Sequence, residues 1–277
     1  MYGLSDCRSL LFMPAHRERA VAKARGLPCD AIVLDLEDAV SPADKAHARD
    51  AAVAELGRGL NGRLALVRAN GADSGWQADD LAALANAPFD HLVLPKVEHS
   101  DEVAAAADAV GRPVVAMIES PRGLLDAPRI AAAPGCAGLF AGTNDLAHAL
   151  KLPAGGSRAG LVLALQTIIL AAVLADVPAF DGVFNRLDDP AGLAAECEEG
   201  AAFGFRGKTL IHPGQIETAN RVFLGDAAAL AADLRLLAEA AAEGAVRHDG
   251  AMVEAMHVAA ARARIARARA LGVVDAG

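Results

Sequence analysis

Two carboxylates, Glu119 and Asp145, have a spacing that could create a metal site. They lie 26 residues apart, each at the end of an apolar run, and this separation is one strand and helix unit. On neighbouring parallel strands, whose axes are about 5 Å apart, both side chains could reach one cation. Two carboxylates without a His or Cys cluster suit Mg²⁺, which keeps several waters, better than Zn²⁺. The structural alternative is that Asp145 caps the next helix and Glu119 pairs with Arg122.

A second acidic group ends the run AIVLDLEDAV, where Asp35, Glu37 and Asp38 occur within four residues. Like charges this close raise one another's pKa unless a cation or hydrogen-bond donors share the space. We therefore expect Glu37 and Asp38 to hold the waters of the ion, or to pair with Arg68 or Lys96. Asp35 should point to the same side of its strand as Glu37, deeper in the fold.

Asp38 and Arg68 each have a structural alternative to a role in the site. Asp38 could cap the helix that follows SPADKAHARD, or pair with Lys45 or Arg49. Arg68 closes the run LVRAN and is the best candidate for an anion clamp, because a guanidinium can hold a carboxylate with two parallel hydrogen bonds. An ion pair between Arg68 and Glu37 is compatible with that role.

These residues need a scaffold that gathers the ends of several strands. Eight apolar runs alternate with alanine-rich stretches of helical period until about Phe223, which predicts a (β/α)8 TIM barrel with its site at the carboxyl ends of the strands. An open doubly wound sheet is the competing fold. The runs are RSLLFMP from Arg8, AIVLDLE from Ala31, RLALVRAN from Arg63, HLVLPK from His91, PVVAMIES from Pro113, GLFAGTNDL from Gly138, FDGVFNRL from Phe180 and GKTLIHP from Gly207.

The predicted domains follow from this order of elements. Residues 1–224 should form the barrel that carries the metal site. Residues 225–277 should form a C-terminal helical segment, with two helices around the turn EGAVRHDGAM, that serves as a lid or a subunit contact.

The composition limits the possible classes of function. The chain has 277 residues and a net charge of -9, which argues against a general nucleic-acid binder. Its four cysteines are far apart and form no C-x-x-C pair, as expected for reduced thiols in the cytoplasm. The longest apolar run, Leu161–Val177, contains Gln166 and Thr167 and is short for a membrane span, so we expect a buried helix or a subunit contact.

Seven motifs, taken in order, resemble those of citrate lyase beta chains and their relatives in the HpcH/HpaI aldolase superfamily, which includes malyl-CoA and citramalyl-CoA lyases. The motifs are LLFMPAHRERAVAKA, VLDLEDAVSPADKAHAR, LVRAN, LVLPKVE, AMIES, GLFAGTNDLA and GFRGKTLIHPGQI. The resemblance implies a Mg²⁺-dependent TIM barrel that makes or breaks a carbon-carbon bond between an acyl-CoA and a small keto acid, such as oxaloacetate, pyruvate or glyoxylate.

Matched motif by motif, the resemblance also implies roles for particular residues. Glu119 in AMIES and Asp145 in GTNDL would bind the metal, and Arg68 would grip the keto-acid carboxylate. Glu37 and Asp38 would support the metal site. The candidates for the CoA phosphates are the basic residues of the first strand and helix unit, Arg17, Arg19 and Lys23. Family members commonly form trimers in which the C-terminal segment lies near the active site of a neighbour.

The C-terminal segment departs from the family pattern. The family often has G-x-M-V-D where this chain has GAMVE, so Glu254 stands where an acidic residue takes part in proton transfer. The extra methylene changes the reach of the carboxyl group, and an error of about 1 Å matters in proton transfer. Three hypotheses follow: a lyase for a short 3-hydroxyacyl-CoA such as citramalyl-CoA or malyl-CoA, a CoA-independent aldolase acting on pyruvate or oxaloacetate, and a noncatalytic subunit that binds keto acid or CoA.

Overall fold

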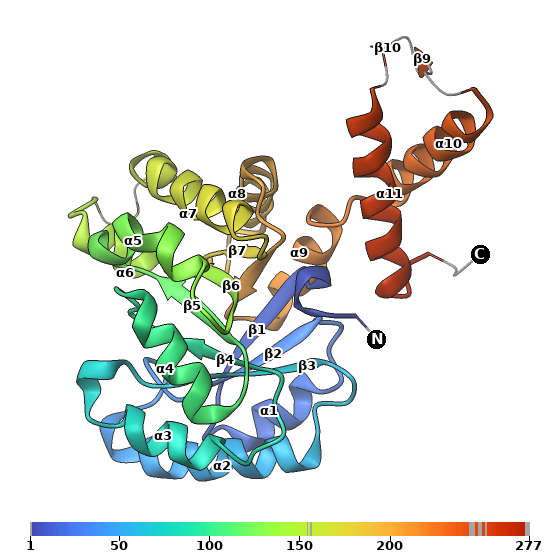
Figure 1. Cartoon of the computed structure of the whole chain (residues 1–277). Coiled ribbons are helices and arrows are strands. Elements are labelled where there is room, and N and C mark those ends of the chain that lie inside the picture. The colour runs from blue at the N-terminus through green and yellow to red at the C-terminus, as the bar shows by residue number, and fades with distance from the viewer. Residues whose placement is uncertain are drawn as a thin grey trace.

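The chain folds into a closed barrel of eight parallel strands surrounded by helices (Figure 1). The computed structural model describes residues 2–153, 155, 157–243, 247–248, 251–252 and 254–274. The strands follow chain order around the barrel, and β1 pairs with both β2 and β8, so the predicted TIM barrel is confirmed over the open sheet. The strands are β1 Ser9–Pro14, β2 Ala31–Asp35, β3 Leu64–Arg68, β4 His91–Leu94, β5 Val114–Ile118, β6 Cys136–Ala141, β7 Ala179–Asp181 and β8 Gly207–Leu210.

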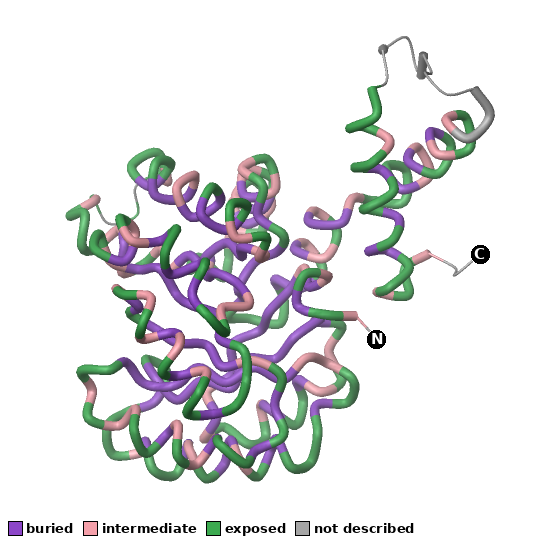
Figure 2. Tube along the Cα trace, viewed as in Figure 1, coloured by how far each residue is buried: buried purple, intermediate pink, exposed green. Residues whose placement is uncertain are grey.

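Alternation along these strands separates two apolar layers. One set of buried side chains fills the barrel interior, where the rings of Phe12 and Phe180 each meet the ring of Phe140 edge to face. The other set, which includes Leu11, Ile32 and Leu34, belongs to the larger core beneath the helices. Figure 2 shows the strands as the most buried part of the molecule. Because the interior is filled, the space for a site lies at the carboxyl ends of the strands.

The helices begin and end at recognisable signals. Helix α5 starts at Pro121, directly after Ser120, whose hydroxyl accepts a hydrogen bond from the Gly123 N–H at 3.1 Å. Glu119 directly precedes this capping residue, so the start of α5 limits where the side chain of Glu119 can point. The barrel helices are α1 Glu18–Ala24, α2 Lys45–Arg58, α3 Gln77–Leu84, α4 Ser100–Val110, α5 Pro121–Ala131, α6 Thr143–Ala149, α7 Val162–Leu174, α8 Pro190–Phe203 and α9 Ile216–Val222.

Helix α7 corresponds to the long apolar run and is only half buried. Leu165 and Ile168 are buried, whereas Leu163 and Leu170 on the other face are 80% and 69% exposed. Of the two expectations for this run, the buried helix is wrong for the single chain, and the subunit contact stays a prediction. Among the described helices, none has both the length and the apolar character needed to cross a membrane.

The predicted C-terminal helices are present as α10 Ala227–Glu243 and α11 Ala255–Ala270. They pack on each other, and Arg264 donates two hydrogen bonds to Asp233 at 2.7 and 2.6 Å. Between them, β9 Arg247–His248 pairs with β10 Ala251–Met252; the rest of the turn expected at EGAVRHDGAM lies largely outside the described residues. The boundary at residue 224 stays a prediction.

Arg267 attaches this C-terminal segment to the amino end of the barrel. Its buried guanidinium donates hydrogen bonds to the carbonyl oxygens of Asp6, Cys7, Arg206 and Phe223. Cys7 precedes β1 and Arg206 precedes β8, so the attachment is at the end of the barrel opposite the carboxyl ends of the strands. In Figure 1 the two helices accordingly extend away from the barrel.

Candidate active site

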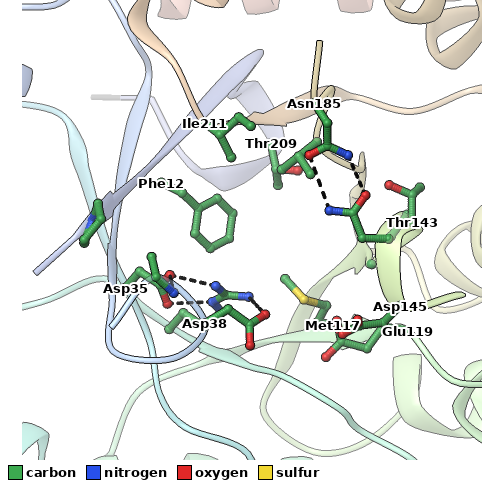
Figure 3. Close-up of a pocket in the computed structure, with 17 residues that line it drawn as sticks. Phe12, Asp35, Asp38, Met117, Glu119, Thr143, Asp145, Asn185, Thr209 and Ile211 are labelled. Carbon is green, nitrogen blue, oxygen red and sulfur yellow. Dashed lines mark hydrogen bonds and ion pairs between the residues drawn. The ribbon is translucent and has the colours of Figure 1, made fainter. Parts of the chain in front are cut away.

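A cavity of about 380 Å³ opens at the carboxyl ends of the strands (Figure 3). Four of the predicted site residues line it: Arg68, Asp38, Glu119 and Asp145. Glu37 borders an adjoining groove of about 970 Å³, which shares Asp38, Glu119 and Asp145 with the cavity. The expectation that strand ends bring these side chains together is therefore confirmed for these five residues.

Glu119 and Asp145 lie side by side on one wall of the cavity (Figure 3). Glu119 follows β5 and is only 6% exposed, and Asp145 lies in the first turn of α6. One oxygen of Glu119 accepts a hydrogen bond from the Lys96 peptide N–H at 2.6 Å. Burial, followed by the charges of Glu37 and Asp145, raises the pKa of Glu119 to about 8.

The structural alternatives for this pair of carboxylates are wrong. Arg122 lies 3.6 Å from Glu98, and no ion pair joins it to Glu119 in the described part of the chain. Helix α6 begins after Gly142, with no side-chain cap from Asp145. Within the described residues, neither Glu119 nor Asp145 forms an ion pair with a cation, so ionisation of both side chains would leave uncompensated negative charge at the cavity wall.

Gly142 leaves the room that the side chain of Glu119 occupies at the cavity wall. A Cβ atom built at residue 142 would lie 2.3 Å from the Glu119 Cβ and 2.6 Å from its Oε2. These separations are far below a van der Waals contact, so any side chain at this position would displace Glu119.

Arg68 is the centre of a second, mostly buried cluster. Its Nε and Nη2 donate to Asp35 at 2.7 Å each, and its Nη1 lies 3.0 Å from Glu37 and 3.6 Å from Asp38. The guanidinium also lies 4.9 Å from the centre of the Phe12 ring. Burial alone would lower the pKa of Arg68, but the charge and hydrogen bonds of Asp35 outweigh it and raise that pKa.

The partners of Arg68 differ in part from those expected. The pairing with Glu37 is confirmed. The edge of the guanidinium that can grip a carboxylate with two parallel hydrogen bonds, formed by Nε and Nη2, is occupied by Asp35. Asp35 is therefore a direct partner of Arg68. A substrate anion would have to use the remaining N–H groups of Nη1 and Nη2. The physical reason is burial, since a guanidinium removed from water needs an acceptor in every direction.

The other cations near this cluster have partners other than the side chain of Asp38. Lys96 Nζ donates to Glu37 at 2.8 Å, whereas Lys45 Nζ donates to the carbonyl oxygens of Leu36 and Glu37. Arg49 pairs with Asp80 at 2.8 Å. Asp38 thus has neither Lys45 nor Arg49 as its partner among the described residues, and its side chain stays 63% exposed beside the cavity.

The donor set fits Mg²⁺. Nowhere in the described part of the chain do three or more His, Cys, Asp or Glu side chains form a group able to hold a metal ion by themselves. Two uncompensated carboxylates instead suit an ion that keeps waters or binds substrate oxygens in its other positions. Mg²⁺ has this habit, whereas structural Zn²⁺ sites require four protein ligands.

The cavity residues that were not identified from the sequence include Phe12 on β1, Met117 on β5 and Thr209 on β8. They belong to the inward-facing positions of their strands, so alternation counted along each run could have found them. Asn185, which follows β7 and also lines the cavity, exchanges hydrogen bonds with Asn144 (Figure 3).

Four predicted site residues, Arg17, Arg19, Lys23 and Glu254, lie outside both this cavity and the adjoining groove. Arg17 and Lys23 are exposed, at the start and on the surface of α1. Glu254 is exposed at the start of α11, where its N–H donates to His257 Nδ1 at 3.0 Å. Because Arg267 holds α11 at the opposite end of the barrel, the single chain does not bring Glu254 to its own cavity.

A closed (β/α)8 barrel with carboxylates and a buried guanidinium around one cavity at its carboxyl end has the architecture of a TIM-barrel enzyme. The sequence matches the family model of HpcH/HpaI aldolase/citrate lyase over residues 8–213, and the chain belongs to this family.

Comparison with known proteins gives similarities along nearly the whole chain. It is 42% identical over 282 residues to a (3S)-malyl-CoA thioesterase of Cereibacter sphaeroides, with 97% of each protein covered. It is 34% identical over 264 residues to a citrate lyase subunit beta-like protein of Mycobacterium tuberculosis, covering 93% of this chain and 94% of that protein. The crystal structure of Mycobacterium tuberculosis CitE in complex with magnesium, acetoacetate and coenzyme A has a TM-score of 0.82 at 33% identity, covering 96% of this chain and 99% of that one.

Proposed function

We propose that the protein is a Mg²⁺-dependent carbon-carbon lyase that cleaves a short 3-hydroxyacyl-CoA, of the malyl-CoA or citramalyl-CoA kind, to an acyl-CoA and a small keto acid. The observation that carries the proposal is the pair of uncompensated carboxylates, Glu119 and Asp145, in the same cavity as Arg68. The ligands named for the related CitE structure, magnesium, acetoacetate and coenzyme A, support this substrate class.

The cavity residues divide the work of binding. Glu119 and Asp145 hold the metal ion, and Glu37 and Asp38 complete the acidic surroundings. The ion, when bound, supplies positive charge for the oxygens of the keto acid. Arg68 offers its remaining N–H groups to a substrate carboxylate and is kept in place by Asp35. Phe12 and Met117 form an apolar wall that limits access of water to the substrate.

The reaction requires one proton to leave and one to be added. The substrate hydroxyl loses its proton as the bond between C2 and C3 breaks, which yields the keto acid and the enolate of the acyl thioester. That enolate then takes up a proton at C2. Glu254 is the proposed acid or base for this transfer, from a neighbouring subunit, since Arg267 fixes α11 at the wrong end of its own barrel.

This arrangement requires a homo-oligomer, and we propose a trimer. The exposed apolar side chains of α7, Leu163, Leu170, Val173 and Leu174, support subunit contact, because a surface helix this apolar is costly in water. Arg17 and Lys23 remain the proposed contacts of the CoA phosphates, since both are exposed, Arg17 three residues after the end of β1 and Lys23 in the last turn of α1. The four free thiols support a cytoplasmic location.

Product analysis tests the proposed reaction. The protein is incubated with malyl-CoA or citramalyl-CoA, with Mg²⁺ or with a chelator, and the products are separated by mass spectrometry. We expect an acyl-CoA and a keto acid only with Mg²⁺, and a loss of orders of magnitude in Glu119→Gln. Glu98→Gln, which changes a neighbouring carboxylate outside the metal pair, is the control. Equal turnover with and without chelator would contradict the proposal.

A second candidate is hydrolysis of the same thioester, favoured by the 42% identical relative named (3S)-malyl-CoA thioesterase. Water would add to the thioester carbonyl and the C–S bond would break, giving the free hydroxy acid and the thiol of CoA. The same assay separates the candidates, because hydrolysis leaves C2 and C3 joined. Free pyruvate or oxaloacetate turnover that is insensitive to added CoA would instead indicate a CoA-independent aldolase.

A further inference from the structure

Lys96 has an unusual backbone at the edge of the metal pair. Its φ is +55°, in the left-handed region, although it is not a glycine. A residue with a side chain seldom adopts this conformation, and such residues concentrate at functional sites. Lys96 lies two residues after the end of β4, in the motif LVLPKVE.

This backbone directs two parts of Lys96 to two different carboxylates. The peptide N–H donates to Glu119 Oε1 at 2.6 Å, and the ammonium donates to Glu37 Oε1 at 2.8 Å. One residue of the loop after β4 therefore connects the carboxyl ends of β5 and β2. The other oxygen of Glu119 faces Gly142, on the side where α6 carries Asp145.

Neighbouring glycines fix the path of this loop. A Cβ atom at Gly123 would lie 2.2 Å from the Val97 carbonyl oxygen, so the loop passes directly against the start of α5. A Cβ atom at Gly71 would lie 3.4 Å from Lys96 Cδ. The direction of the Lys96 N–H is thus set by contacts on both sides of the loop.

We propose that Lys96 is the positioning residue of the metal pair: its left-handed backbone aims the peptide N–H at Glu119, so that the free oxygen of Glu119 faces the ion together with Asp145. The ammonium has a supporting role, because it keeps Glu37 paired and away from the ion. This inference rests on the proposed function, since it assigns Lys96 to the same metal site.

The test compares two substitutions that both remove the ammonium and differ in backbone preference. Lys96→Gly adopts a positive φ without cost and keeps the N–H on Glu119. Lys96→Val is β-branched, disfavours a positive φ and should turn the N–H away. Mn²⁺ is used as the probe of the magnesium site, and its binding is followed by the electron paramagnetic resonance signal of the free ion, without any assay of activity.

We expect Lys96→Gly to bind Mn²⁺ within about threefold of the wild-type affinity, and Lys96→Val to bind about 10- to 100-fold more weakly, the usual effect of losing a group that orients a metal ligand. Asp176 has a φ of +56° and lies outside both the cavity and the adjoining groove. Asp176→Gly and Asp176→Val are therefore matched controls for the backbone strain, and thermal melting of all four variants reports on folding.

Each outcome decides the question. Equal weakening in Lys96→Gly and Lys96→Val would assign the effect to the ammonium and overturn the backbone role, as would wild-type affinity in both. A similar loss of Mn²⁺ binding in Asp176→Val would attribute the effect to general strain and also overturn it. If the wild-type protein binds neither Mn²⁺ nor Mg²⁺, the proposed function fails together with this inference, which distinguishes that failure from the others.

Discussion

Asp35 and Arg68 occupy paired positions on β2 and β3, and their side chains are joined by two hydrogen bonds of 2.7 Å each. Their side chains are 2% and 11% exposed. Asp35 on β2 thus fixes the plane of the Arg68 guanidinium at the cavity and balances its charge. A buried ion pair contributes little by its presence, but removing one partner leaves an uncompensated charge.

Asp35→Ala should therefore lower the free energy of unfolding by about 3–5 kcal/mol. Arg129→Ala, which breaks a pair with Asp126 at the surface, is the control and should cost at most about 1 kcal/mol. Urea unfolding measures both. A loss in Asp35→Ala no larger than that of the control would show that Glu37 and Asp38 alone can balance Arg68.

The metal-free protein should become less stable as the pH rises through the range set by Glu119. Its pKa is raised from 4.5 to about 8 in the folded protein, so the fold binds this proton more tightly than the unfolded chain does. The resulting stabilisation is complete below about pH 4.5 and is lost as the pH approaches 8. Urea unfolding in the presence of a chelator, at about pH 5 and about pH 9, measures the change.

Glu119→Gln is the control for this pH effect because it cannot titrate. Its loss of stability over the same range should be smaller than that of the wild type. Excess Mg²⁺ should restore the stability of the wild type at high pH, since the ion binds the ionised carboxylates of the folded state. Identical pH dependence in the two proteins would contradict the assignment to Glu119.

Two inactive variants should complement each other if Glu254 acts in a neighbouring subunit. Glu254→Gln and Glu119→Gln, each inactive alone, are co-expressed with different tags and purified through both. Mixed oligomers contain cavities with an intact Glu119 facing a subunit with an intact Glu254, so a fraction of the wild-type turnover should return. Mixed oligomers without activity would place Glu254 outside the reaction.

Lys23→Glu should weaken binding of the CoA part of the substrate. An exposed charge contributes little to binding, so reversing it should raise KM for the thioester by about 3- to 10-fold and leave kcat nearly unchanged. Arg129→Glu changes another exposed cation, on α5, and is the control. The effect should diminish at high salt, because solvent-exposed charges are screened. An unchanged KM would exclude Lys23 as a phosphate contact.

Much of this arrangement could be predicted from the sequence. Each strand is an apolar run that ends in a polar residue, and closure of the barrel brings all those ends to one rim. This rule was sufficient to place Glu119, Asp145 and Arg68 around one cavity. The rule works because the order of strands and helices determines where the strands end, and the pattern of apolar residues predicts that order.

The remaining features depend on contacts that no pattern reveals. Asp35 pairs with Arg68 because the register of β2 and β3 places them opposite each other, and register is set by packing. The positive φ of Lys96 results from the loop that carries it. The path of α11 depends on Arg267, which donates to four carbonyl oxygens from three separate places along the chain and would look like any other arginine in a basic helix.

The absence of a side chain at Gly142 also has a consequence for how members of the family could lose function. One methyl group at this position would displace the side chain of Glu119, while Glu119 and Asp145 themselves stayed unchanged. If Glu119 binds the proposed ion, a homologue could therefore lose that ion through a single codon change and still carry both carboxylates. Among relatives, the residue that precedes the TNDL segment is the one to inspect first when inactive members are sought.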